Sequence, residues 1–155
     1  MSFLISGLDA KEFKLLFSLS TDRLAARGVI RKTVDAKPGY PCRVSLQDAN
    51  PGETVLLLNY ESHKTASPYR SSYAIYVRDH VEQSEQYQNE LPPVFKNRPI
   101  ALRIFNKDSM LIGADMGVNS ELESKINAAL NRPDAAYLHA HNAMHGCFAA
   151  EIRRQ

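Results

Sequence analysis

Three of the five histidines of this chain, His139, His141 and His145, fall within one seven-residue window, and one of its two cysteines, Cys147, follows almost directly. Imidazole and thiolate groups are ligands that zinc prefers, and they are also groups that move protons or attack electrophiles in enzymes. The cluster therefore marks the place where a metal site or a catalytic site is expected.

The spacing of the histidines matters because successive side chains of a β-strand point to opposite faces. In a C-terminal hairpin, Tyr137, His139 and His141 would share one face, and the apolar Leu138, Ala140 and Phe148 would share the other. The apolar face is the better candidate for the core. The histidine face is therefore expected to be partly exposed or to line a cleft.

Three alternatives follow for this cluster. If His141 pairs with Cys147 across the hairpin, His139, His141 and Cys147 could hold zinc or another divalent ion as a cofactor. The same three residues could instead be catalytic, with Cys147 as the nucleophile and an imidazole as its base. In the third alternative all three are structural, because strand histidines often pack and free cysteines are often buried. A shift of the register by one residue would turn Cys147 to the other face.

Four further residues are candidates for binding an anionic small molecule. Tyr69 and Arg70 end a short turn, Arg43 lies in a predicted strand, and Asn142 lies in the last hairpin. A guanidinium group forms paired hydrogen bonds with a carboxylate or phosphate, and a neighbouring tyrosine can stack or donate. The alternative is that these arginines are solvated or paired with nearby carboxylates. We expect Cys42 to be a buried core thiol.

The composition narrows the class of protein. The chain has 155 residues, 44% of them hydrophobic, and a net charge of +2, which is typical of one globular domain over residues 1–155. Its basic residues form no dense block, so no nucleic-acid partner is expected. No apolar run is long enough to cross a membrane, and residues 1–9 lack a positive leader. With only two cysteines, the expected location is the reducing cytoplasm; the oligomeric state and a Cys42–Cys147 bridge stay open.

The elements that must position these residues are mostly strands. Helices are expected at about 10–19, capped by Asp9, and at about 121–130, with Ser120 and Glu123 as a capping box. Strands and hairpins are expected in the segments 43–47, 54–60, 73–78, 100–105 with 110–116, and 136–141 with 147–153. Residues 79–99 read as a loop with one helical turn. Strands arriving as hairpins predict an α+β fold, a mainly antiparallel sheet with two amphipathic helices packed on it.

The motifs PCRVSLQDANPGE (41–53), VLLLNY (55–60), SPYR (67–70), IYVR (75–78) and HAHNAMHGC (139–147) resemble a bacterial family, domain of unknown function 1203. The resemblance runs from about Gly28 to Arg153. It implies a small stand-alone bacterial cytoplasmic protein, and it implies no particular activity, substrate or cofactor.

Two functions are therefore expected. In the first, a polar pocket formed by the last hairpin and the turn at 67–70 binds an anionic small molecule or a metal ion, with or without catalysis. In the second, the chain is a non-enzymatic protein-interaction domain in which the histidine and cysteine cluster is structural.

Overall fold

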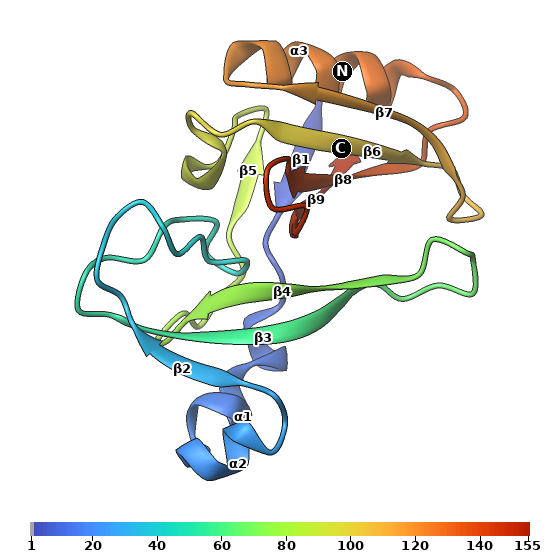
Figure 1. Ribbon diagram of the computed structural model, residues 1–155. Helices are drawn as coiled ribbons and strands as arrows, with labels where there is room; N and C mark the ends of the chain where they lie inside the picture. The colour runs from blue at the N-terminus through green and yellow to red at the C-terminus, as the bar shows by residue number, and fades with distance from the viewer. Residues whose placement is uncertain (1) are drawn as a thin grey trace.

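Two antiparallel sheets lie one above the other in the computed structural model, which describes residues 2–155 (Figure 1). The larger sheet has the order β5 (Gln86–Gln88), β1 (Phe3–Ser6), β9 (Phe148–Arg154), β8 (Tyr137–Asn142), β6 (Ile100–Phe105) and β7 (Leu111–Gly117). The smaller sheet has the order β2 (Ile30–Thr33), β3 (Thr54–His63) and β4 (Ser71–Arg78). The predicted α+β class is confirmed, with the strands divided between two sheets.

The helices cover the outer side of each sheet. The helix α3 (Ser120–Asn131) packs against β6, β7 and β8, while α1 (Lys14–Phe17) and α2 (Thr21–Ala25) lie below the smaller sheet in Figure 1. Two short 3₁₀ turns occur at η1 (Ala10–Glu12) and η2 (Pro93–Phe95). The inner faces of the two sheets are left to face each other.

The two predicted hairpins are confirmed as β6–β7 and β8–β9, and the apolar run at 54–60 is the central strand of the smaller sheet. Strands β1, β2 and β5 were not predicted, because each has only three or four residues and too little pattern to recognise. A tight turn precedes β3: the amide of Glu53 donates to the carbonyl of Asn50, and Gly52 has φ +89°.

The predicted strand at 43–47 is wrong. The amide of Leu46 donates to the carbonyl of Cys42, and that of Cys42 to the carbonyl of Gln47, so the chain turns back on itself. Leu46 adopts φ +52° and is fully buried. Alternating apolar residues are buried here as expected, but the local conformation is a tight turn instead of a strand.

Both predicted helices differ from the structure at their ends. Asp9 caps as expected by accepting from the amide of Lys11, but the helix breaks at Phe13 into η1 and α1. At α3 the cap is Asn119, with φ +51° and no side-chain capping bond, so the capping box at Ser120 is wrong. The Asn119 side chain is used elsewhere, because its Oδ1 accepts from the amide of Asn97 at 3.0 Å. The α2 helix was not predicted.

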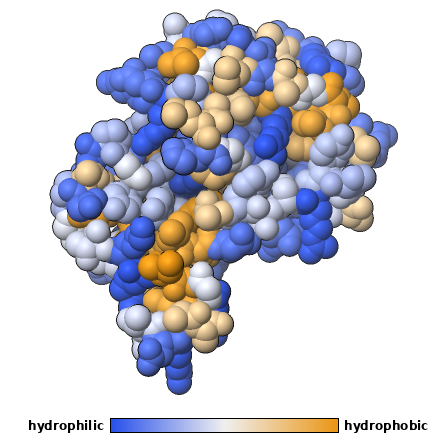
Figure 2. All heavy atoms as spheres, in the orientation of Figure 1, coloured by the Kyte–Doolittle hydropathy of each residue, from blue (hydrophilic) through white to orange (hydrophobic). Residues whose placement is uncertain are grey.

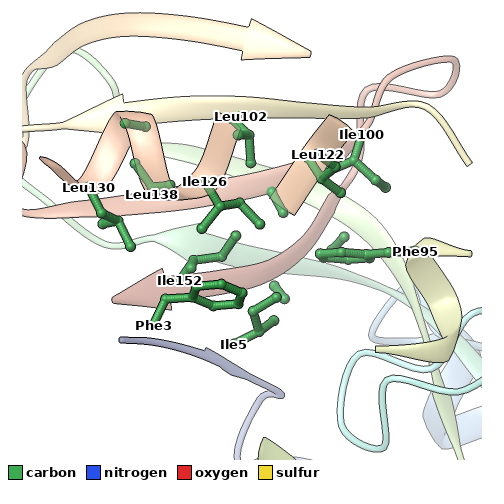
Figure 3. Close-up of a cluster of buried hydrophobic side chains, with 14 of the residues drawn as sticks. Phe3, Ile5, Phe95, Ile100, Leu102, Leu122, Ile126, Leu130, Leu138 and Ile152 are labelled. Carbon is green, nitrogen blue, oxygen red and sulfur yellow. The ribbon is translucent and has the colours of Figure 1, made fainter. Parts of the chain in front are cut away.

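The main core lies between α3 and the outer face of the larger sheet (Figure 3). Leu122, Ile126 and Leu130 recur every fourth residue along α3 and meet Leu102 and Leu138 of the sheet. All five are at most 1% exposed. The apolar face of β8 is buried in this cluster, as the alternation of its residues predicts. The histidine face of β8 therefore points toward the smaller sheet.

A second cluster packs α1 and α2 against the smaller sheet, with Phe13 and Leu24 over Leu56, Ile75 and others. Apolar residues also reach the surface of this part of the molecule, in the lower half of Figure 2, where Leu15 and Ile30 are exposed. Within residues 2–155 no helix is both long enough and apolar enough to cross a membrane.

Replacing Ile126 by alanine tests the α3 core. Ile126 has no exposed surface, so the substitution leaves a cavity and should lower the free energy of unfolding by about 2–5 kcal/mol in denaturant titrations. The matched change Glu123→Ala, on the exposed side of the same helix, should cost less than about 1 kcal/mol. Equal losses in the two variants would contradict this packing.

Candidate functional site

The histidines of β8 lie in an aromatic layer between the two sheets. The ring of His139 lies 4.9 Å from that of His63 on β3 and 5.2 Å from that of Phe105 on β6, measured between centroids. The ring of His141 lies 5.1 Å from that of Tyr73 on β4. His139 and His141 thus share the face that their spacing predicts, but they are only 3% and 2% exposed. The prediction that this face is exposed or lines a cleft is wrong, because the smaller sheet covers it.

Hydrogen bonds fix this layer from both sides. His63 Nδ1 lies 2.9 Å from the carbonyl of Tyr69, which can only accept, so this nitrogen carries the donated proton. His63 Nε2 lies 2.7 Å from the hydroxyl of Tyr137, which in turn lies 2.9 Å from Ser109 Oγ. His141 Nδ1 donates in the same way to the carbonyl of Gly146 at 3.0 Å. The rings therefore connect β3, β8 and the hairpin turn.

Burial weakens the basicity of these imidazoles. Burial lowers the pKa of His141 to about 4, while its bond to Gly146 raises it less and the positive charge of Arg103 lowers it further. Burial also lowers the pKa of His139, and Glu151, whose Oε2 lies 3.7 Å from His139 Nε2, partly opposes that effect. Burial raises the pKa of Glu151, but bonds from His139 and Arg153 outweigh it and bring it to about 2.

The register of the last hairpin separates Cys147 from the histidines. His139 pairs with Glu151, and a bulge then pairs His141 with Phe148 instead of with Cys147. The ring of Phe148 consequently joins the histidine layer, 5.1 Å from His139 and 5.9 Å from His141. The expectation that Phe148 belongs to the apolar core face is wrong, because the bulge shifts it to the opposite side.

A pocket of about 500 Å³ opens at the junction of the two sheets. Its walls come from four parts of the chain: the segment around 39–43, the smaller sheet, the residues before β6, and the β8–β9 turn. Arg43, Asn142 and Cys147 line it together with apolar and aromatic side chains, and His145 lies at the exposed edge of the turn. The structure thus brings three of the predicted site residues to one cavity.

Arg43 is the most constrained of these residues. Its Nε donates to the carbonyl of Phe148 at 2.7 Å, its Nη1 to the carbonyl of Pro41, and its Nη2 to the sulfur of Cys147 at 3.1 Å. Asn142 Nδ2 lies 3.5 Å from the same sulfur. Arg43 is only 3% exposed, yet no ion pair within residues 2–155 includes it. Burial lowers the pKa of its guanidinium, and the sulfurs of Cys147 and Cys42 oppose that effect.

The backbone around Arg43 explains how so polar a group is held inside. The amide of Arg43 donates to the carbonyl of Tyr76 on β4, and its carbonyl accepts from the amide of Leu8. At Gly7, just before, an added Cβ would lie 2.1 Å from the carbonyl oxygen of Val44, so only glycine allows this approach. Cys42 is fully buried, as predicted, and its sulfur accepts from the amides of Val44, Ser45 and Arg78.

Three other arginines pair with carboxylates. Arg98, which also lines the pocket, forms paired bonds of 2.8 and 2.7 Å with Asp48. Arg78 pairs with Glu53 and Arg153 with Glu151. Arg103 on β6 forms no ion pair among the described residues and donates to the hydroxyl of Tyr73, but it is less buried than Arg43.

Tyr69 and Arg70 lie outside this pocket. Arg70 is exposed and its Nη2 pairs with Glu61 Oε2 at 3.1 Å, while the ring of Tyr69 lies against Phe105. The expected partnership between the last hairpin and the turn at 67–70 is therefore replaced by one between the hairpin, the segment around 39–43 and the smaller sheet. The turn contributes to the histidine layer instead, through the carbonyl of Tyr69.

The metal interpretation finds no ligand set in the structure. In the part of the chain that the structure describes, no three His, Cys, Asp or Glu side chains come together as a metal ion would require. The sulfur of Cys147 is bonded to Arg43 and Asn142, while His141 Nδ1 is bonded to Gly146. Both cysteines are free thiols, so the bridge left open by the sequence does not form here.

Several pocket residues were not predicted from the sequence. Tyr73 and Tyr76 were visible only as part of an alternating strand, and Leu57 only as part of an apolar run. His63 ends β3 and gave no signal of its own, although its buried ring joins the histidine layer.

The fold and the pocket define a small α+β protein with a ligand-sized cavity where two antiparallel sheets meet. The chain belongs to the family described as protein of unknown function (DUF1203), whose model matches residues 39–154, as the resemblance in its motifs predicted. All the residues that line the pocket lie within this range. No curated protein and no solved structure matches the chain.

The buried imidazoles predict a loss of stability in mild acid. His141 has a pKa of about 4 in the folded chain and an ordinary pKa of 6.5 when unfolded. The unfolded state therefore binds more protons as the pH falls through this window, and the free energy of unfolding decreases. Between pH 7 and pH 5, His141 alone should account for a loss of about 2 kcal/mol.

Denaturant titrations of His141→Asn across this pH range provide the measurement. Asparagine removes the titrating group and retains an amide that can donate to the carbonyl of Gly146, so the pH dependence should become shallower. In the control His80→Asn, which removes an imidazole that is 93% exposed and lies outside the buried layer, the steep pH dependence should remain. A profile in His141→Asn as steep as that of the unmodified protein would show that His141 is not the titrating group.

Proposed function

We propose that the protein binds a small anionic ligand in the pocket at the junction of its sheets, with Arg43 as the anion-binding group. The observation that carries this proposal is the buried guanidinium of Arg43, which lines the pocket and has no carboxylate partner within the described residues. A buried charge is costly unless an opposite charge compensates it.

Two groups could supply that opposite charge. One is the thiolate form of Cys147, whose sulfur already accepts a bond from Arg43. The other is an anionic group of a ligand in the pocket. Three of the five N–H groups of Arg43 donate within the protein, which leaves one on each terminal nitrogen for such a ligand. Both alternatives place negative charge at the same point.

The surrounding groups support an anion over a cation. No aspartate or glutamate among residues 2–155 lines the pocket, and Asp48, which contacts the lining residue Arg98, is engaged in an ion pair with it. Asn142 presents an amide N–H beside the sulfur of Cys147. Cys147 could in addition react with a bound electrophile, but its hydrogen-bonding partners are Arg43 and Asn142 and not an imidazole base. The proposed function is therefore the binding of an anion, without a chemical reaction at the thiol of Cys147.

Competitive alkylation of Cys147 tests this proposal. Iodoacetate and iodoacetamide are nearly equal in size and differ in charge, so the ratio of their rates measures the preference of the site for an anion. Relative to glutathione, this ratio should rise about tenfold at Cys147, because charge-assisted bonds contribute about 1.5–3 kcal/mol. Mass spectrometry of the labelled peptides gives both rates, and the fully buried Cys42 should stay unmodified in the folded protein.

A matched pair of variants assigns the effect to the pocket. Asn142→Asp places a negative charge beside the sulfur without changing the shape of the side chain, and it should abolish the preference for iodoacetate. Asn127→Asp makes the same change on α3, remote from the pocket, and should leave the ratio as it is. A ratio at Cys147 equal to that of glutathione would overturn the proposal.

A further inference from the structure

We infer that the ligand is an apolar monocarboxylate, a molecule with one anionic group on a hydrophobic body of about one or two rings. This inference rests on the proposed function and narrows it to a class of compounds. It follows from the charges, the walls and the size of the pocket, taken in turn.

The charges of the pocket allow for one anionic group. Two arginines, Arg43 and Arg98, line the pocket. The charge of Arg98 is compensated by its paired bonds with Asp48, which is itself buried. Among the described residues that line the pocket, Arg43 is then the one arginine whose charge has no carboxylate partner. A di- or triphosphate or a tricarboxylate would carry charges into the pocket that no lining residue compensates.

Most of the residues that line the pocket away from Arg43 are apolar or aromatic. Leu57 and Tyr76 lie side by side in the pairing of β3 with β4, and Pro41 and Pro99 line the pocket as well. The phenol oxygen of Tyr73 accepts from Arg103 Nη1 at 2.6 Å, so its most polar atom is already engaged. Such walls favour an apolar body over a sugar or a polyol, whose hydroxyl groups would lose their hydrogen bonds to water.

Met144 gives the pocket an apolar rim. It lies in the β8–β9 turn, lines the pocket and is 85% exposed, the most exposed large apolar side chain of the described chain. A methionine is flexible and adapts to irregular apolar surfaces. A ligand that covers this side chain would remove it from water. The volume of about 500 Å³ falls in the range of small-molecule sites and suits a body of one or two rings.

Calorimetric titration of the intact protein with four probes tests this class. Naphthylacetate has the anionic group and the apolar body, naphthylacetamide lacks the charge, acetate lacks the body, and citrate has excess charge. Naphthylacetate should bind at least about tenfold more tightly than each of the other three. It should also slow the alkylation of Cys147 by the neutral reagent iodoacetamide, because both occupy the same pocket.

Two methionine variants separate the apolar contact from general effects on folding. Met144→Ser should weaken both naphthylacetate and naphthylacetamide by about threefold to tenfold, because the side chain contacts the body and not the charge. Met116→Ser removes another exposed methionine, on β7 and outside the pocket, and should leave both affinities unchanged. Both positions are exposed, so neither variant should impair folding.

The outcomes distinguish this inference from the proposed function. If acetate or citrate binds as tightly as naphthylacetate, or if Cys147 prefers iodoacetate while naphthylacetate does not bind, the anion site stands and the apolar class is overturned. If naphthylacetamide binds as tightly as naphthylacetate, the role of the charge is overturned. Equal affinities of Met144→Ser and the unmodified protein would exclude the rim from the site.

Discussion

The buried guanidinium of Arg43 connects four parts of the structure at one point. Its side chain donates to the start of β9, to Pro41 in its own turn and to the sulfur of Cys147, while its backbone bonds to β4 and to the segment after β1. These bonds link the turn at 41–46, the last hairpin and the edge of the smaller sheet to one another, and they satisfy polar groups that burial would otherwise make costly. The pocket lies at this junction, with Arg43 and Cys147 in its wall.

The histidine layer has a different role from that of the pocket. Its rings fill the space between the two sheets with aromatic contacts, and their nitrogens bond to carbonyl and hydroxyl groups of elements on both sides. Such a layer is compact and specific in its hydrogen bonds, whereas an aliphatic layer would leave those carbonyl groups without donors. The ring of His141 lies against Tyr73, a wall of the pocket, so the layer also supports the site from behind.

Much of the architecture follows from local sequence patterns, because the spacing of apolar residues within one element determines which of its faces is buried. The alternation of Leu138, His139 and Ala140 gave the correct faces of β8, and the fourfold spacing of Leu122, Ile126 and Leu130 gave the buried side of α3. The bulge in the last hairpin has no such local cause. It places the ring of Phe148 on the histidine face, against His139, and no pattern within the hairpin marks its position.

The candidate site was predicted only in part for the same reason. Cys147, Asn142 and Arg43 were recognised from their chemistry. Which residues surround them, and which arginines of the pocket are neutralised, as Arg98 is by Asp48, depends on contacts between remote segments. The turn at 67–70 was assigned to the wrong neighbour, since a short motif does not say which element it will meet. A partly buried residue such as Tyr73 gains its place in a pocket from contacts with a neighbouring sheet, and the pattern within its own strand does not indicate those contacts.

The contact between Arg43 and Cys147 joins positions 104 residues apart. A growing chain on the ribosome contains the residues of most strands before Cys147, the second residue of this contact, has been synthesised. The cavity is consequently among the last features to form, and its ordering waits on the slow closure of a long loop. Incomplete chains that stop before the last hairpin would lack β8 and β9, the two central strands of the larger sheet, and with them one wall of the cavity.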